Sequence, residues 1–181
     1  MKTVQVLDKR FKLSISEEDI QKRVNEIAQQ MNKDLEGKSP LFVCILNGAF
    51  MFASDIFKQI TVENSSITFF RLSSYVGTKS TGKIKLIMGF TEDLANRTVV
   101  ILEDIVDTGV TIQNTIEQVK AHKPKEIYIA TLVYKPEACK VPVNLDYVGF
   151  EIPNKFIVGY GLDYDLMGRN LPAIYTLAED E

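Results

Sequence analysis

A short stretch of this chain combines three carboxylates, two hydroxyls and a glycine directly after an apolar run. The stretch spans residues 99–112 and reads VVILEDIVDTGVTI. Its polar residues and its glycine are, in order, Glu103, Asp104, Asp107, Thr108, Gly109 and Thr111. Side chains of these types can bind a metal ion, accept hydrogen bonds from sugar hydroxyls or transfer protons. The stretch is therefore the first candidate for a functional site.

The second half of this stretch has the features of a phosphate site. Residues 106–111 should lead into a helix, whose first backbone N–H groups have no partner within the helix. Such groups, together with the helix dipole, favour a bound anion such as phosphate. Gly109 lets the backbone approach a ligand closely, and Thr108 and Thr111 can add hydroxyl donors. We therefore expect this part of the chain to bind a phosphate group.

The carboxylates need a different ligand, because they repel phosphate. Glu103 and Asp104 suit the vicinal hydroxyls of a ribose, and they equally suit a Mg²⁺ ion held through water. Asp107 is left for proton transfer, which typically contributes about 10²–10⁴-fold to a rate. The alternative is that these acids only cap a helix and face solvent. Their combination at the carboxyl end of an expected strand favours a site, because ligands of open α/β sheets bind there.

Strands and helices are expected to alternate along the chain. The expected helices cover residues 16–35, 49–60 and 110–121, and the expected strands cover residues 41–46, 66–72, 84–90, 98–102 and 126–134. Ser16 is a good N-cap for the first helix, and apolar residues follow it at helical spacing. The apolar runs at 41–46 and 98–102 are typical of strands buried on both faces. The pattern predicts an α/β fold with a mostly parallel, twisted sheet flanked by helices.

A chain of 181 residues can bury a sizeable core, so we expect one domain over residues 1–181. The core should cover about residues 16–146. The pattern becomes irregular from about residue 147 to residue 181. This part and the N-terminal segment should together form a small hood lobe beside the sheet. Residues 73–83, a polar segment with two glycines, should form a loop over the site.

Composition excludes several classes of function. The net charge of −3 gives no basic field for nucleic acid or an anionic membrane. Cys44 and Cys139 lack metal-ligand spacing and suit a reducing cytosol, so we expect a cytoplasmic protein. We see no signal-peptide core and no apolar run of membrane-spanning length. Neither a P-loop nor a G-x-G-x-x-G dinucleotide motif occurs, and the single histidine, His122, should cap a surface helix.

Residues 99–112 closely resemble the phosphoribosyl pyrophosphate signature of type I phosphoribosyltransferases. The segment VGFEIPNKFIVGYGLDYD at residues 148–165 is similar to the purine-pocket segment of hypoxanthine-guanine phosphoribosyltransferases. Similar pieces include FFRLSSY at residues 69–75, the S-x-G of residues 80–82, and Lys135. These pieces run from about Leu41 to Arg169. Their combination is far more specific than the signature alone.

The resemblance implies an enzyme of purine salvage, a pentosyltransferase among the glycosyltransferases. Such an enzyme transfers the phosphoribosyl group of phosphoribosyl pyrophosphate to a 6-oxopurine, hypoxanthine or guanine. The products are IMP or GMP and pyrophosphate, and Mg²⁺ is the cofactor. The family's habit further implies a homodimer or a homotetramer. The preference among hypoxanthine, guanine and xanthine is left open by the sequence.

The resemblance also implies a role for each matching residue. Glu103 and Asp104 would hold the ribose hydroxyls, and Asp107 would act as base or acid near purine N7. The 5-phosphate would be bound by Asp107, Thr108, Gly109, Val110 and Thr111. The purine would be bound by Lys135 at its 6-oxo group, by stacking on Phe156, by the backbone of Ile157 and by Asp163. Mg²⁺ would be held by Glu103, Asp104 and Asp163. Pyrophosphate would be bound by Asn47, Gly48 and Arg169, and Ser74 and Tyr75 would lie in the loop over the active site.

Two positions depart from the family pattern. Asn47 and Val110 stand where lysines are common in relatives, so two positive charges near the phosphates are missing. The family's turn at Asn47 binds pyrophosphate largely through backbone amides, often with a cis peptide, and the sequence leaves the Leu46–Asn47 isomer open.

Two alternatives remain. One is a non-catalytic regulator that senses phosphoribosyl pyrophosphate and binds RNA or protein, and the acidic balance argues against it. The other is a transferase for a different base, against which Lys135 and Phe156 argue.

Overall fold

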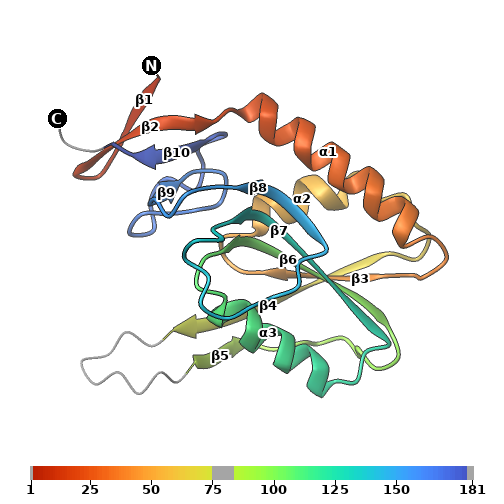
Figure 1. The fold of residues 1–181 in the computed structure, drawn as a ribbon. Helices are drawn as coiled ribbons and strands as arrows, with labels where there is room; N and C mark the ends of the chain where they lie inside the picture. Colours follow the sequence, from red (N-terminus) through yellow and green to blue (C-terminus); the bar gives the residue numbers. More distant parts are fainter. Residues whose placement is uncertain (1, 75–83, 179–181) are drawn as a thin grey trace.

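The computed structural model describes residues 2–74 and 84–178 (Figure 1). Its larger sheet has six strands in the order β5-β4-β3-β6-β7-β8. These strands are β3 (Leu41–Ile45), β4 (Ser66–Ser74), β5 (Ile84–Met88), β6 (Thr98–Val106), β7 (Glu126–Tyr134) and β8 (Tyr147–Glu151). All neighbours pair in parallel except β4 and β5, which are antiparallel. The expected α/β fold with a mostly parallel sheet is confirmed.

Helices cover both faces of this sheet, with α1 (Glu17–Asp34) and α2 (Phe50–Phe57) on one face and α3 (Val110–Ala121) on the other (Figure 1). Successive strand residues point to opposite faces. Accordingly, Phe42 and Val100 pack in the cluster with α1 and α2, and Val43 and Ile101 pack in the cluster with α3. Every residue of β3 is buried, as expected for a strand covered on both sides.

The first helix begins where the sequence predicts. Ser16 is its N-cap, and the Ser16 hydroxyl accepts a hydrogen bond from the Asp19 backbone N–H at 3.1 Å. Helix α3 coincides with the expected range, and α2 ends at Phe57, earlier than expected. None of the helices in the described parts of the chain is long and apolar enough to cross a membrane.

A second, four-stranded antiparallel sheet forms the hood. Its order is β1-β2-β10-β9, and its strands are β1 (Thr3–Val6), β2 (Lys9–Ile15), β10 (Ile174–Leu177) and β9 (Ile157–Val158). It packs around its own buried cluster, which includes Phe11, Val158 and Tyr175. Both ends of the chain therefore meet in the hood, beside one end of the larger sheet (Figure 1).

Two strands differ from the sequence-based expectation. We expected a strand over residues 98–102, but β6 continues to Val106, because its ladder with β7 runs on through Glu103↔Thr131 and Val106↔Tyr134. Glu103 and Asp104 thus lie on the strand itself and not in the loop after it. We also expected the core to end near residue 146, whereas β8 pairs with β7 and extends the larger sheet to Glu151.

Candidate active site

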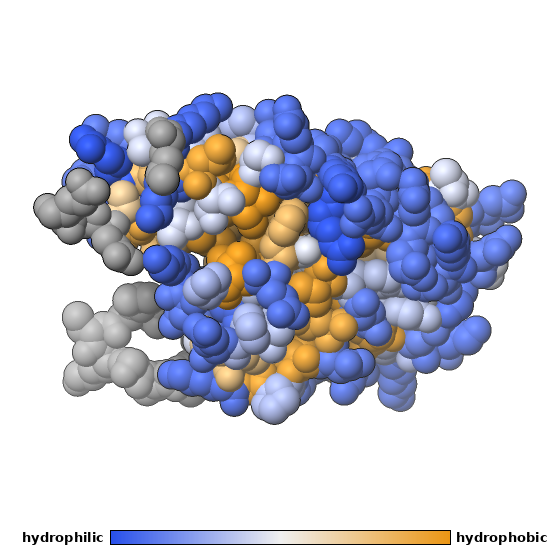
Figure 2. Space-filling view, turned by 45° about the horizontal axis from the view of Figure 1, so that its top comes forward, coloured by the Kyte–Doolittle hydropathy of each residue, from blue (hydrophilic) through white to orange (hydrophobic). Residues whose placement is uncertain are grey.

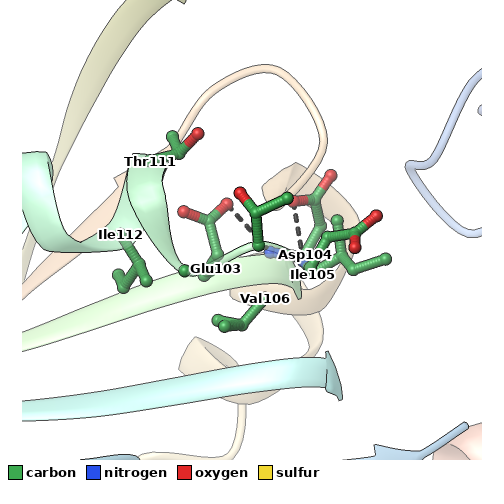
Figure 3. A pocket seen from close by; sticks show the side chains of 9 residues that line it. Glu103, Asp104, Ile105, Val106, Thr111 and Ile112 are labelled. Atoms are coloured by element: carbon green, nitrogen blue, oxygen red, sulfur yellow. Dashed lines mark hydrogen bonds between the residues drawn. The ribbon is translucent and has the colours of Figure 1, made fainter. Parts of the chain in front are cut away.

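A cavity of about 200 Å³ lies where β6 ends and α3 begins (Figure 3). It is lined by Glu103, Asp104, Ile105, Val106, Asp107, Thr108, Gly109, Thr111 and Ile112. These are the residues that the sequence singled out, together with the apolar residues between them. Parallel strands place their carboxyl ends at one edge of a sheet, so β3 and β7 also end near this cavity.

Glu103 and Asp104 differ in their surroundings although they are adjacent. Glu103 is buried, and its Oε1 accepts a hydrogen bond from the Asp104 backbone N–H at 3.3 Å. Asp104 is half-buried, and its Oδ1 accepts from the Ile105 N–H at 2.8 Å. Burial, and then the charge of Asp104, raise the pKa of Glu103 well above its ordinary value. Burial also raises the pKa of Asp104, against hydrogen bonds and the charge of Arg169, which lower it.

This pair of carboxylates suits a hard cation. Glu103 Oε2 is buried and has no hydrogen-bond partner among the residues that the structure describes. A cation beside two carboxylates whose pKa values are raised would stabilise their ionised forms. Within residues 2–74 and 84–178, no three acidic, histidine or cysteine side chains form a metal-binding group. Mg²⁺ commonly binds through one or two carboxylates and keeps water or substrate oxygens as its other ligands, so this pair is a suitable donor set.

The turn between β6 and α3 lines the cavity on one side and packs against residues 140–141 on the other. Gly109 is the N-cap of α3 with φ +82°, and it has no side chain to cap the first-turn N–H groups. A Cβ at Gly109 would lie 2.4 Å from the carbonyl oxygen of Val141. The backbone N–H groups of Lys140 and Val141 both donate to the Thr108 carbonyl. The segment after β7 thus supports the turn from behind, and no sequence pattern pointed to it.

Lys135 and Asp107 form an ion pair at the edge of the cavity. The Lys135 ammonium lies 3.1 Å from Asp107 Oδ2. The lysine side chain is 6% exposed and the aspartate side chain is 44% exposed. The pairing arises because Lys135 directly follows β7, and its backbone N–H donates to the Val106 carbonyl at the end of β6. A buried ammonium beside a reachable carboxylate can both donate to a ligand and influence a proton transfer.

The hood presents an aromatic surface. The ring of Phe156 is 46% exposed and lies 6.2 Å from the ring of Phe11 and 5.8 Å from the ring of Tyr164, between centroids. Ile157 follows in β9 and is buried. Of the two, Phe156 thus has the exposed face that a stacking role requires.

The residues expected to bind pyrophosphate also gather beside Asp104. The Leu46–Asn47 peptide bond is cis. A Cβ on Gly48 would lie 1.4 Å from Asp104 Oδ2, so only glycine allows this approach. Arg169 donates to the Gly161 carbonyl at 2.6 Å and pairs with Asp163 Oδ1 at 2.8 Å.

Three further positions concern the metal site, the loop over the site and a glycine that the sequence analysis did not select. Asp163 accepts a further hydrogen bond from the Leu166 N–H at 2.7 Å, so both of its carboxylate oxygens have partners within the chain. Tyr75 and the side chain of Ser74 lie outside the described residues, and so does most of the expected loop over residues 73–83. Gly161 was not selected as a site residue, although it stands in a Gly-Tyr-Gly sequence that indicates close backbone packing.

Known proteins resemble this chain in both sequence and fold. A family model described as "Phosphoribosyl transferase domain" matches residues 15–165. A hypoxanthine-guanine phosphoribosyltransferase of Streptococcus thermophilus is 41% identical over 170 residues, covering 93% of this chain and 94% of that one. One of Staphylococcus aureus is 43% identical over 164 residues, covering 90% and 91%.

Solved structures agree with these sequence matches. The crystal structure of a hypoxanthine phosphoribosyltransferase from Staphylococcus aureus has a TM-score of 0.87 and 42% identity, covering 92% of this chain and 91% of that one. A hypoxanthine-guanine phosphoribosyltransferase from Bacillus anthracis has a TM-score of 0.85 and 38% identity, covering 92% and 97%.

Proposed function

Because this chain belongs to the phosphoribosyltransferase family, alongside hypoxanthine-guanine phosphoribosyltransferases, we propose that it is an enzyme of purine salvage. It transfers the phosphoribosyl group of phosphoribosyl pyrophosphate to hypoxanthine, guanine or both, giving IMP or GMP and pyrophosphate. The observation that carries the proposal is a cavity in which the buried Glu103 and the half-buried Asp104 of β6 adjoin the open N-terminus of α3. A sugar phosphate needs both kinds of group within a few ångströms of each other.

Each part of phosphoribosyl pyrophosphate has a matching group in the site. The 5-phosphate accepts hydrogen bonds from the backbone of residues 107–111 and from the hydroxyls of Thr108 and Thr111. The ribose hydroxyls donate to Glu103 and Asp104. Pyrophosphate meets the Asn47–Gly48 backbone and Arg169. Because Asn47 and Val110 are neutral, these contacts depend more on backbone N–H groups than they would with lysine at either position.

The base is recognised by Lys135 and Phe156. Lys135 donates to the 6-oxo group of the purine, which disfavours adenine because its 6-amino group cannot accept. Phe156 stacks on the purine ring, and the backbone of Ile157 contacts its edge. Asp107, beside Lys135, acts as base or acid near purine N7. The ion pair supports this division of roles, since it keeps a cation and an acid–base group within one hydrogen-bond length.

Mg²⁺ is the cofactor that the donor set fits. Glu103 and Asp104 would hold it, and Asp163 would join them once its contacts with Arg169 and the Leu166 N–H open. When bound, Mg²⁺ supplies positive charge that stabilises the departing pyrophosphate.

We further propose a cytoplasmic homodimer or homotetramer. The apolar surface between hydrophilic regions in Figure 2 and exposed side chains such as Phe50 and Phe69 support an association of subunits.

The test offers each base separately to the protein with Mg²⁺ and phosphoribosyl pyrophosphate, and follows pyrophosphate release. Turnover with hypoxanthine or guanine, and none with adenine, is the expected result. Turnover with a pyrimidine alone would assign a different base. Absence of turnover with every base, together with RNA retained in a filter-binding experiment, would favour a regulator instead. A reaction without any base measures the background hydrolysis.

A further inference from the structure

The carboxylate of Asp55 connects three parts of the molecule: helix α2, on which it lies, helix α1 on the same face of the larger sheet, and the hood. Asp55 lies on α2, and its Oδ2 accepts a hydrogen bond from the Tyr160 hydroxyl at 2.6 Å and from the Gln21 amide of α1 at 3.0 Å. Its Oδ1 lies 2.7 Å from the Lys58 ammonium. The Asp55 side chain is 18% exposed, and Tyr160 is buried. Asp55 is therefore a shared anchor and not a surface acid.

The protonation states strengthen this contact. Burial acts to raise the pKa of Asp55, but hydrogen bonds from Gln21, Lys58 and Tyr160 outweigh it and hold this pKa below its ordinary value. Burial and the bond to Asp55 raise the pKa of Tyr160. The tyrosine thus stays a donor and the aspartate stays ionised, which gives a charge-assisted hydrogen bond.

Tyr160 belongs to the turn of the hood that lies on the candidate pyrophosphate site. Its neighbour Gly161 packs so closely that a Cβ there would lie 2.1 Å from the Gly48 carbonyl oxygen. The Gly161 N–H donates to the Arg169 carbonyl at 2.9 Å, and the Gly161 carbonyl accepts from the Arg169 guanidinium at 2.6 Å. The position of this turn therefore determines both the gap to Gly48 and the position of Arg169.

Helix α2, which bears Asp55, also follows the Asn47–Gly48 loop against which Gly161 packs. Helix α2 begins at Phe50, directly after the Asn47–Gly48 loop, and Asp55 lies further along it. The Phe50 N–H donates to the Asn47 carbonyl at 3.4 Å, and the Ala49 N–H donates to the Ile45 carbonyl at 3.2 Å. A bond from Asp55 to Tyr160 thus links the helix that bears the loop to the turn that bears Arg169.

We propose that Asp55 and Tyr160 are positioning residues, which hold the Tyr160–Gly161 turn against the Asn47–Gly48 loop and so set the geometry of the pyrophosphate-binding groups. This inference rests on the proposed function for the identity of the ligand. Neither side chain has to touch the substrate. Their effect should be larger on phosphoribosyl pyrophosphate and pyrophosphate than on the purine, because Lys135 and Phe156 lie outside this turn and only Asp163, which pairs with Arg169, links the purine contacts to it.

The primary test is Tyr160→Phe, which removes only the hydroxyl. Calorimetry measures its dissociation constant for phosphoribosyl pyrophosphate with Mg²⁺, and steady-state assays measure KM for phosphoribosyl pyrophosphate and for hypoxanthine. We expect affinity for phosphoribosyl pyrophosphate to fall by up to about tenfold, because a tenfold change matches the lower end of what a hydrogen bond to a charged group contributes to stability. KM for hypoxanthine should change much less, whereas a general loss of structure would raise both KM values together.

A matched control exists in the core. The Tyr147 hydroxyl donates to Asp34 Oδ2 at 2.9 Å, and Tyr147 is also a buried tyrosine bonded to an aspartate of a helix. Tyr147→Phe should lower the unfolding temperature without changing affinity for phosphoribosyl pyrophosphate. Asp55→Asn keeps an oxygen that can accept from Tyr160, so its affinity should lie closer to that of the unchanged protein than the affinity of Asp55→Ala does.

Each outcome decides the question. Unchanged affinity in Tyr160→Phe, an equal rise in KM for hypoxanthine, or an equal loss of affinity in Tyr147→Phe would overturn the positioning role. If the unchanged protein turns over oxopurines while Tyr160→Phe behaves identically, only this inference fails. If the unchanged protein does not bind phosphoribosyl pyrophosphate, the proposed function fails with it.

Discussion

At the scale of single residues, the three acids of the cavity are held in different states. Glu103 is buried, and its Oε2 has no hydrogen-bond partner within the described residues, whereas Asp104 is half-buried beside Gly48 and Asp107 is paired with Lys135. Burying a carboxylate oxygen that has no hydrogen-bond partner costs stability, because its desolvation is not compensated. Glu103 Oε2 could still accept a hydrogen bond from a ligand hydroxyl or contact a cation, as the proposed function requires.

Asp107→Ala should slow the chemical step far more than it weakens binding. If Asp107 transfers a proton at N7, we expect kcat to fall about 10²–10⁴-fold. KM for both substrates should change little, because the backbone contacts to the 5-phosphate remain. Steady-state kinetics with hypoxanthine checks this, and Thr108→Val serves as a comparison that should raise KM for phosphoribosyl pyrophosphate instead. Equal kcat in Asp107→Ala and the unchanged protein would remove Asp107 from its role.

Glu103→Gln should stabilise the free protein and impair its activity. The pKa of Glu103 is raised in the folded state, so the stability of the unchanged protein falls as pH rises above the unfolded pKa of about 4.3. The variant avoids this loss, and at neutral pH we expect its unfolding temperature to be about 2–4 °C higher. The gain should shrink as pH falls through about 4.3 and disappear roughly one pH unit below that, where the glutamate is protonated in both states. Thermal unfolding at several pH values measures it, and a gain that is independent of pH would contradict the explanation.

At the scale of elements, the junction of β6 and α3 forms the cavity of the candidate site. The strand supplies Glu103 and Asp104, the turn supplies Asp107 and Gly109, and the helix supplies Thr111. The turn is supported by the segment after β7, which contacts Gly109 and Thr108 through backbone atoms. Its position thus depends on a neighbouring strand connection and not only on its own residues.

Comparing Gly109→Ala with Gly37→Ala should separate the free energy lost through an unfavourable backbone conformation from the effect of a steric clash of the new Cβ. Both glycines have positive φ, +82° and +71°, but a Cβ at Gly37 would meet nothing within 4 Å. Each alanine should destabilise the protein by about 1 kcal/mol through its backbone conformation. Only Gly109→Ala should also raise KM for phosphoribosyl pyrophosphate, because the Val141 carbonyl forces the turn to move. Urea unfolding and kinetics measure the two effects, and a similar rise in KM for Gly37→Ala would contradict this separation.

At the scale of the whole molecule, polar contacts between distant segments join the parts. Asp55 links α1, α2 and the hood, and Glu126 links the start of β7 to Thr98 of β6 and to Lys38. Arg23 of α1 donates to the carbonyls of Val148 and Gly149 on β8. Among these contacts, the hydrogen bond between Asp55 and Tyr160 is the one that joins core and hood, and the others join segments of the core.

Stability should decline on the acid side because of these contacts. Hydrogen bonding to Thr98, and then to Lys38, lowers the pKa of Glu126 against the effect of burial, and the pKa of Asp55 is lowered as well. A carboxyl whose pKa is lower in the folded state stabilises the protein above its unfolded pKa, about 4, and loses this effect as pH falls through the folded pKa. The urea midpoint should fall below pH 4, and less steeply in Glu126→Gln. An identical decline in that variant would exclude Glu126 as a contributor.

The sequence alone was sufficient for what depends on neighbouring residues. Apolar spacing and the Ser16 cap predicted α1 and α3, and continuous apolar runs predicted β3 and the first part of β6. The types of residue between Glu103 and Thr111 predicted a site for a phosphorylated sugar, because the chemistry of each side chain is local. The helices and strands form where their local sequence predicts them, because the backbone preference of each segment agrees with its burial in the folded chain.

The tertiary structure decided what depends on residues far apart in the chain. The ladder with β7 placed Glu103 and Asp104 on a strand, and β8 joined the larger sheet although its sequence looked irregular. Lys135 met Asp107, and Tyr160 met Asp55 across 105 positions of sequence. No local pattern encodes such pairs, because they form only when packing of the whole core brings the ends of separate strands and the hood together.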